Sequence, residues 1–284
     1  MTDGIWLVLR AAGLMLSLEA TGIALFIALF ASGPPPCRLA IVRRGRRLAL
    51  ACLALLVLQL SFEPVHLAGD WSGLADVTQW QLLASDSAAL AFIVRLAGMV
   101  LIAVALTARA ALAVTFAGVL LVVLSYLVTG HTVMPPVRPA RSLLLAMHVM
   151  GVIFWFGALG PLRVLLRQAS AVVATGAVES FSRVALWLVP LLALAGVLLA
   201  WLLLPSAAAL LRPYGLLLLC KLALFAILLG LAAYNRLRLT PALNAGAAGA
   251  ASRLAATVLT EYVFIGVVLL ATAAMSGYFS PGED

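Results

Sequence analysis

Apolar runs of about 20 residues recur along the whole chain, and short charged or Pro/Gly-rich stretches separate them. A helix needs roughly 20 such residues to cross the hydrocarbon core of a bilayer. With 65% hydrophobic and 10% charged residues, this chain of 284 residues has more apolar side chain than a soluble core of its size can bury. The excess must face lipid, so the sequence predicts an all-α, polytopic integral membrane protein.

The runs predict eight transmembrane helices in one membrane domain that covers residues 1–284. We expect spans at Ile5–Phe30, Leu48–Leu67, Ala88–Ala108, Leu112–Thr129, Leu143–Leu166, Val184–Leu204, Tyr214–Tyr234 and Leu254–Phe279. The N-terminus has no basic stretch leading into a short apolar segment with a cleavage site. We therefore expect the first helix to stay in the mature protein.

Arginines divide unevenly between the two sets of connecting loops. The loops after the first, third, fifth and seventh spans carry twelve, whereas the other loops and the termini carry three and most of the acidic residues. Cytoplasmic loops concentrate Arg and Lys, so both termini are expected on the periplasmic side of a bacterial inner membrane. The net charge of +8 then reports orientation and not nucleic-acid binding. The outer loop from Ala68 to Ser87 mixes aromatic and polar residues, as an amphipathic interfacial segment does.

All three histidines are expected on the outer side. His66 ends the second span, His131 follows the fourth, and His148 lies about one turn into the fifth. Three methionines accompany the last two histidines: Met134, Met147 and Met150. Imidazole suits copper and zinc, and a thioether suits Cu(I), so these side chains predict a copper site.

Local spacing narrows the candidate ligands. His131 and Met134 are three residues apart, and Glu63 and His66 repeat that interval on the second span. Residues three apart share one face of a helix, so each pair can approach a single ion. We take His131, His148, His66 and Met134 as the candidate metal ligands, although histidine and methionine are also common fillers at a membrane interface.

Ionisable residues inside the spans are the second signal, because each costs about 2.5–3.5 kcal/mol at a helix centre on the insertion scale. They are Glu19, Glu63, Arg95, Lys221 and Glu261. Their depths describe a polar column across the bundle, which could form a pathway. The alternative is structural pairing, above all between Glu261 and Lys221 on neighbouring helices.

The residues from about Thr129 to Pro281 resemble the copper resistance protein D (CopD) family. The resemblance rests on short motifs in a fixed order: Thr129-Gly130-His131-Thr132, Met147-His148-Val149-Met150, Trp155-Phe156-Gly157, Phe181-Ser182-Arg183, Pro213-Tyr214-Gly215, Lys221, Asn235-Arg236, Pro241 and Glu261. Residues 141–284 are accordingly expected to form four CopD-like helices, whereas residues 1–140 form four divergent ones.

This resemblance implies a copper-binding membrane protein, not an enzyme, that takes copper, as Cu(I) or Cu(II), from the periplasm and transfers it toward the cytoplasm. It also implies a periplasmic copper-binding protein, C, as partner. Two alternatives stay open. One is a b-type cytochrome with two histidines on facing helices as haem ligands. The other is a non-transporting copper sensor or membrane anchor.

Overall fold

The computed structural model describes residues 2–30, 33–107, 112–128, 138–204 and 206–278. Within these ranges the chain is helical and contains no strand. Its long helices are α1 (Thr2–Leu29), α2 (Pro35–Ala68), α4 (Ser87–Thr107), α5 (Leu112–Leu127), α6 (Arg138–Gln168), α7 (Ala171–Leu203), α8 (Pro213–Tyr234) and α10 (Ala250–Tyr278). Shorter helical segments are η1 (Trp71–Leu74), α3 (Val77–Ser85), η3 (Ala207–Leu211), η4 (Asn235–Leu239) and α9 (Thr240–Asn244).

Seven of these helices are long and apolar enough to cross a membrane, and a helix occupies each of the eight expected runs. The shortest, α5, has 16 described residues, or about 24 Å at 1.5 Å per residue. This confirms the all-α class and the architecture of a polytopic membrane helix bundle. Eight crossings remain a prediction.

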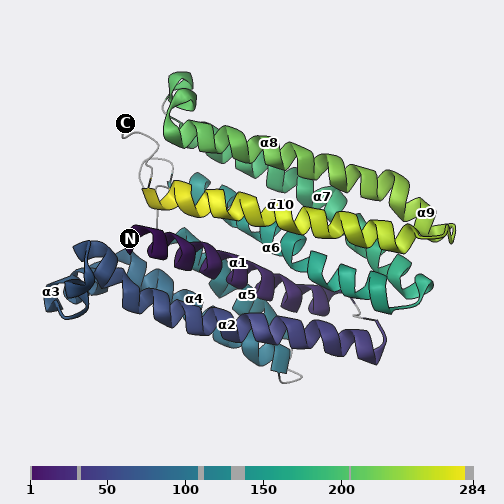
Figure 1. Ribbon diagram of the computed structural model, residues 1–284, viewed down its shortest axis with the longest axis horizontal. Helices are drawn as coiled ribbons and strands as arrows, with labels where there is room; N and C mark the ends of the chain where they lie inside the picture. The colour runs from purple at the N-terminus through teal and green to yellow at the C-terminus, as the bar shows by residue number, and fades with distance from the viewer. Residues whose placement is uncertain (1, 31–32, 108–111, 129–137, 205, 279–284) are drawn as a thin grey trace.

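Successive long helices run in opposite directions, so the N-terminal end of α1 and the C-terminal end of α10 lie at the same end of the bundle (Figure 1). We call this the terminal end. At the opposite end lie the connection from α6 to α7 and the segment α9 between α8 and α10 (Figure 1). Arginines predominate there, so we call it the arginine-rich end.

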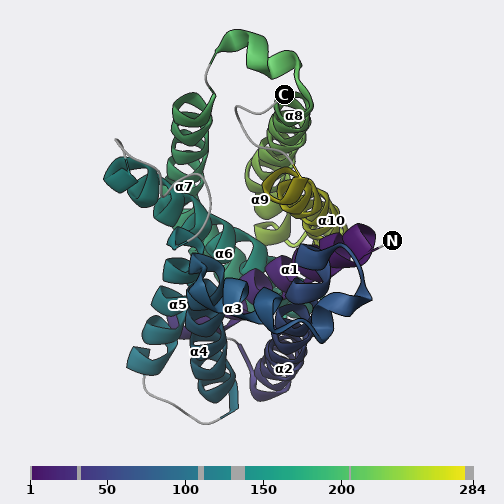
Figure 2. The ribbon, with the colours of Figure 1, turned by 90° about the vertical axis from the view of Figure 1, so that its left-hand side faces the viewer.

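The first helix is the centre of the bundle. α1 contacts α2, α5, α6 and α10, and in the end-on view it lies between the N-terminal and C-terminal groups of helices (Figure 2). Gly22 and Gly157 let α1 and α6 approach closely, since a Cβ added at Gly22 would lie 2.6 Å from the Cα of Gly157. By contrast, α7 and α8 carry many exposed apolar side chains, as lipid-facing helices do.

Two helices begin earlier than hydropathy predicts. α2 begins at Pro35 and not near Leu48, and α7 begins at Ala171 and not near Val184. Both extensions carry arginines or polar residues at the arginine-rich end. Apolar runs mark only the stretch inside hydrocarbon, whereas hydrogen bonding along the backbone continues the helix beyond it.

The expected amphipathic segment between α2 and α4 is helical. Asp70 accepts a hydrogen bond from the Ser72 backbone N–H at the start of η1, and Asp76 accepts one from the Thr78 backbone N–H at the start of α3. These hydrogen bonds hold the pKa of both carboxyls below the usual value for Asp. Both aspartates are therefore ionised at neutral pH, and the carboxylate is the form that caps these helical segments.

The seventh expected span does not end at Tyr234. η4 continues α8 as a π-helical turn and leads into α9, so that one apolar helical stretch runs from Pro213 to Asn244. The hydroxyl of Thr240 donates to the carbonyl oxygen of Asn235 at 2.9 Å. Wide turns of this kind occur often at functional sites, and here the turn carries Asn235 into the core.

Candidate functional site

Glu63 and His66 lie on α2 at the terminal end, where both contact Trp6 of α1. The indole N–H of Trp6 donates to Glu63 Oε2 at 2.8 Å, and its ring stacks on His66 with the centroids 4.2 Å apart. His66 Nδ1 is 3.3 Å from Asp3 Oδ1. The one-turn spacing therefore brings Glu63 and His66 together as predicted, but around an indole ring.

His148 lies on α6 and faces α7. Its Nδ1 is 3.2 Å from the carbonyl oxygen of Leu192, and Gly196 leaves room for the ring, because a Cβ there would lie 3.1 Å from the imidazole. A carbonyl can only accept, so this contact places the hydrogen on Nδ1 and leaves the lone pair on Nε2. Metal-binding histidines are commonly oriented in this way.

The remaining outer candidates are not gathered around His148. Met147 is exposed, and Met150 is partly buried against the core. His131 and Met134 lie outside the described residues. Among the residues that the structure does describe, no three His, Cys, Asp or Glu side chains converge in a metal-binding arrangement.

Glu261 of α10 is buried in the C-terminal half, with 3% of its surface exposed. Both of its carboxylate oxygens accept hydrogen bonds from neutral donors. The indole N–H of Trp155 donates to Oε2 at 3.0 Å, and the amide Nδ2 of Asn235 donates to Oε1 at 2.6 Å. The negative charge is thus hydrogen-bonded and has no cationic partner within 4.0 Å in the described part of the chain.

The alternative of structural pairing between Lys221 of α8 and Glu261 has no counterpart in the structure. No ion pair within 4.0 Å joins them. Lys221 is partly buried on α8.

Glu19 of α1 forms an ion pair with Arg44 of α2, the shorter of the two ion pairs among the described residues. Arg44 of α2 donates to Glu19 Oε1 through Nε at 3.0 Å and through a terminal nitrogen at 2.6 Å, while the hydroxyl of Tyr262 donates to Oε2 at 2.6 Å. Glu19 is 3% exposed at its side chain and Arg44 is 40% exposed. Three helices are thereby joined near the arginine-rich end.

Arg95 of α4 is satisfied within the N-terminal half. Its Nε donates to the hydroxyl of Ser125 at 3.1 Å, and its guanidinium lies 4.1 Å from the ring centroid of Tyr126. The hydroxyls of Tyr126 and Ser17 are 2.7 Å apart. The predicted polar column therefore consists of separate hydrogen-bonded groups on different helix interfaces.

Residues 175–275 match the family model of copper resistance protein D. This match supports assignment to the CopD family. The CopD segment runs from α7 through most of α10, so it contains Lys221, Asn235 and Glu261. No curated protein and no solved structure matches the chain.

Sequence reasoning missed the partners of the buried acids. Asn235 lies in the CopD segment, and Trp155 precedes it; the short motifs included both residues without giving either a role. Arg44 had counted only as a loop cation, and Tyr262 had no role. These contacts join segments that are distant in the sequence. The available signal in the sequence was that polar side chains of several types occur inside or next to the apolar runs.

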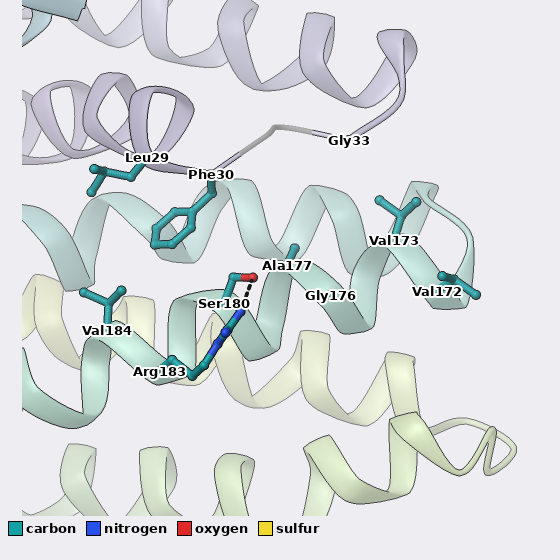
Figure 3. Close-up of a pocket in the computed structure, with 10 residues that line it drawn as sticks. All are labelled: Leu29, Phe30, Gly33, Val172, Val173, Gly176, Ala177, Ser180, Arg183 and Val184. Carbon is teal, nitrogen blue, oxygen red and sulfur yellow. Dashed lines mark hydrogen bonds between the residues drawn. The ribbon is translucent and has the colours of Figure 1, made fainter.

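A pocket of about 770 Å³ lies near the arginine-rich end, between the end of α1 and the first turns of α7 (Figure 3). Its lining is mainly apolar and includes Phe30 and Val173, and Arg183 donates to the hydroxyl of Ser180 at 3.3 Å. Among the described residues, no histidine, methionine or acid lines it. Part of this lining belongs to the start of the CopD segment, but Lys221, Asn235 and Glu261 are not among the lining residues.

Proposed function

We propose that the chain binds copper at the terminal end of the bundle and passes it toward the arginine-rich end. The observation that carries this proposal is the CopD segment at residues 175–275, together with the buried Glu261 carboxylate that it contains. A carboxylate with only neutral partners attracts a cation strongly in a low-dielectric bundle. The cargo is copper, in agreement with the family.

His148 is the described residue best suited to receive the ion. Its Nδ1 contact with the Leu192 carbonyl fixes the ring and leaves Nε2 to coordinate. His131 and Met134 complete the proposed site on the argument of sequence, and His66 contributes only if it leaves its stacked position on Trp6. Imidazole serves both oxidation states of copper.

The orientation follows from charge. The loops after the first, third, fifth and seventh expected spans carry twelve arginines, which favours the cytoplasm for that side and the periplasm of a bacterial inner membrane for both termini. Copper then enters from the periplasm, where a soluble copper-binding protein of type C is the proposed donor. A cysteine replacing exposed Ala75 should react with an impermeant thiol reagent in intact cells. Reaction only after lysis would reverse the orientation.

The transport step is tested by whole-cell copper accumulation. Cells that make the wild-type protein should accumulate more copper than cells without it, and Glu261→Gln should lower uptake at unchanged thermal stability, since the amide fills nearly the same volume. Glu179→Gln is the matched control, because Glu179 is an exposed acid of α7. Normal uptake in Glu261→Gln would remove the carboxylate from the pathway, and equal copper with and without the protein would favour a sensor or anchor.

The cytochrome alternative gains no support from the described histidines. His66 packs on Trp6 of α1, whereas His148 faces Leu192 of α7. They lie at different helix interfaces and do not face one another as haem ligands do.

A further inference from the structure

The hydrogen-bond network around Glu261 continues beyond its first partners. Asn235 donates through Nδ2 to Glu261 and accepts through Oδ1 from the hydroxyl of Thr257, one turn earlier on α10, at 2.6 Å. The same hydroxyl oxygen lies 2.9 Å from the carbonyl oxygen of Leu254 and 3.3 Å from that of Arg253. One hydroxyl hydrogen thus has alternative acceptors.

These contacts suit an ionised Glu261. The carboxylate accepts from Trp155 and Asn235, the Asn235 carbonyl accepts from Thr257, and no buried polar atom of the group lacks a partner. Buried polar groups are costly when unpaired. Glu261 can also bind a proton only if the same side chains can form hydrogen bonds with the neutral carboxylic acid.

We propose that Glu261, Asn235 and Thr257 form a reversible proton-binding site inside the CopD segment. When a proton binds Oε1, the Asn235 amide turns over, and the new carboxyl O–H donates to Asn235 Oδ1. Asn235 Nδ2 then donates to the Thr257 oxygen, and the Thr257 hydrogen rotates to the Leu254 carbonyl, which already lies 2.9 Å away. Trp155 continues to donate to Oε2, so every polar atom is paired in both states.

The chemistry of the site favours a proton over a metal ion. Donors already occupy both carboxylate oxygens at 3.0 Å or less. In the observed arrangement an indole N–H and an amide N–H face the carboxylate, and an N–H group cannot coordinate a cation. No cluster of His, Cys, Asp and Glu able to hold a metal exists among the described residues.

No neighbouring charge fixes the state of Glu261. The elements packed on α10 are α1, α6, α8, α9 and η4. Their ionisable side chains near this level, with those of α10 itself, are Glu19, His148, Arg163, Lys221, Tyr234, Arg236, Arg238, Arg253 and Tyr262. None of these forms an ion pair with Glu261; Tyr262 hydrogen-bonds Glu19, and Arg236 donates to Ser182. Desolvation and the neutral network therefore decide the proton affinity.

Coupling to copper is a further step that rests on the proposed function. A copper cation approaching along the bundle favours the ionised carboxylate, and the proton leaves; when copper departs, the proton returns. Charge inside the membrane then changes less during passage than with copper alone. Proton binding itself needs no copper and can be tested without it.

The test is infrared difference spectroscopy of the purified, copper-free protein, titrated across about pH 4 to pH 10. We expect a protonated-carboxyl band that is absent in Glu261→Gln. Trp155→Phe and Asn235→Leu each remove one donor that favours the anion more than the neutral acid, so each should move the band's titration upward by about one pH unit. Glu179→Gln serves as the control and should leave the band and its midpoint unchanged.

Three results would overturn the proposal: no band lost in Glu261→Gln, an unmoved midpoint in both donor variants, or a band that follows sodium concentration at constant pH. Trp155→Phe keeps the test decisive if Glu261→Gln does not fold, because it keeps an aromatic side chain at this position and leaves Glu261 in place while it removes the N–H donor. A titrating band without copper uptake would preserve the proton site and refute the transport proposal. Copper uptake without a titrating band would preserve the transport proposal and refute the proton site.

Discussion

The contact between α1 and α6 is so close that one methyl group should be enough to disrupt it. In Gly22→Ala, the new Cβ would lie 2.0 Å from the carbonyl oxygen of Ile153 and 2.6 Å from the Cα of Gly157. An ordinary contact begins at 3.4 Å. The obstacle is backbone, which no rotamer change can move, so the two helices must separate by about 1.4 Å (3.4 Å minus 2.0 Å).

This separation should cost stability at the upper end of the range for overpacking, about 3 kcal/mol. At about 2–4 °C per kcal/mol, the midpoint of thermal unfolding should fall by roughly 6–12 °C. The site should respond too, because α1 carries Glu19 less than one turn from Gly22, and α6 carries Trp155 two residues before Gly157. A shift between these helices alters both buried carboxylate networks.

Buried thiols provide the assay. Cys37 and Cys52 are 1% and 0% exposed, so a thiol-reactive fluorophore reports unfolding when the exposed Cys220 has been replaced by serine. Gly230→Ala is the matched control, since a Cβ there meets nothing within 4 Å and alanine favours the helix by about 1 kcal/mol. If Gly22→Ala and Gly230→Ala unfold at the same temperature, the close helix contact does not exist as described.

Two other changes test separate parts of the structure. Tyr262→Phe removes the hydroxyl that donates to Glu19 at 2.6 Å. Hydrogen bonds to charged groups contribute about 1.5–3 kcal/mol, and because Tyr262 is partly exposed, the protein should lose about 1–2 kcal/mol of stability in the same thermal assay. An unchanged unfolding midpoint would contradict this contact. The Thr78 N–H lowers the pKa of Asp76, so the cap is fully present at neutral pH and is lost as pH falls through that lowered pKa. Amide hydrogen exchange in α3, corrected for its intrinsic pH dependence, should therefore accelerate in acid for the wild type. Asp76→Asn keeps a capping oxygen at every pH, so its exchange should not accelerate. Equal acid responses in the two proteins would exclude the cap.

The helices were predictable because lipid imposes a single requirement on every span. Each crossing needs a long apolar run, and such runs located α1, α4 and α8 from the sequence alone. The starts of α2 and α7 were not predictable in this way, since their first turns lie outside the apolar runs. Hydropathy indicates which part of a helix lies in hydrocarbon, but it does not show where the helical backbone begins or ends.

The partners of the buried acids required the fold. Glu261 is 106 residues from Trp155 and 26 from Asn235, and Glu19 is 243 residues from Tyr262. Helical spacing relates only residues three or four apart, so it correctly joined Glu63 and His66 but could not choose among distant partners. The same limit explains why the sequence left both a pathway and a Glu261–Lys221 pair open, and why it could not show that the pair is absent from the structure.

The central claim is copper binding at the terminal end, and the metal content of the purified protein tests it most directly. The wild-type protein should retain copper after dialysis against a competing chelator and should show no haem absorbance. A variant with both His131→Ala and His148→Ala should lose that copper, whereas Met147→Ala, at an exposed thioether, should keep it. Equal copper stoichiometry and affinity in the wild type and the double histidine variant would contradict the account.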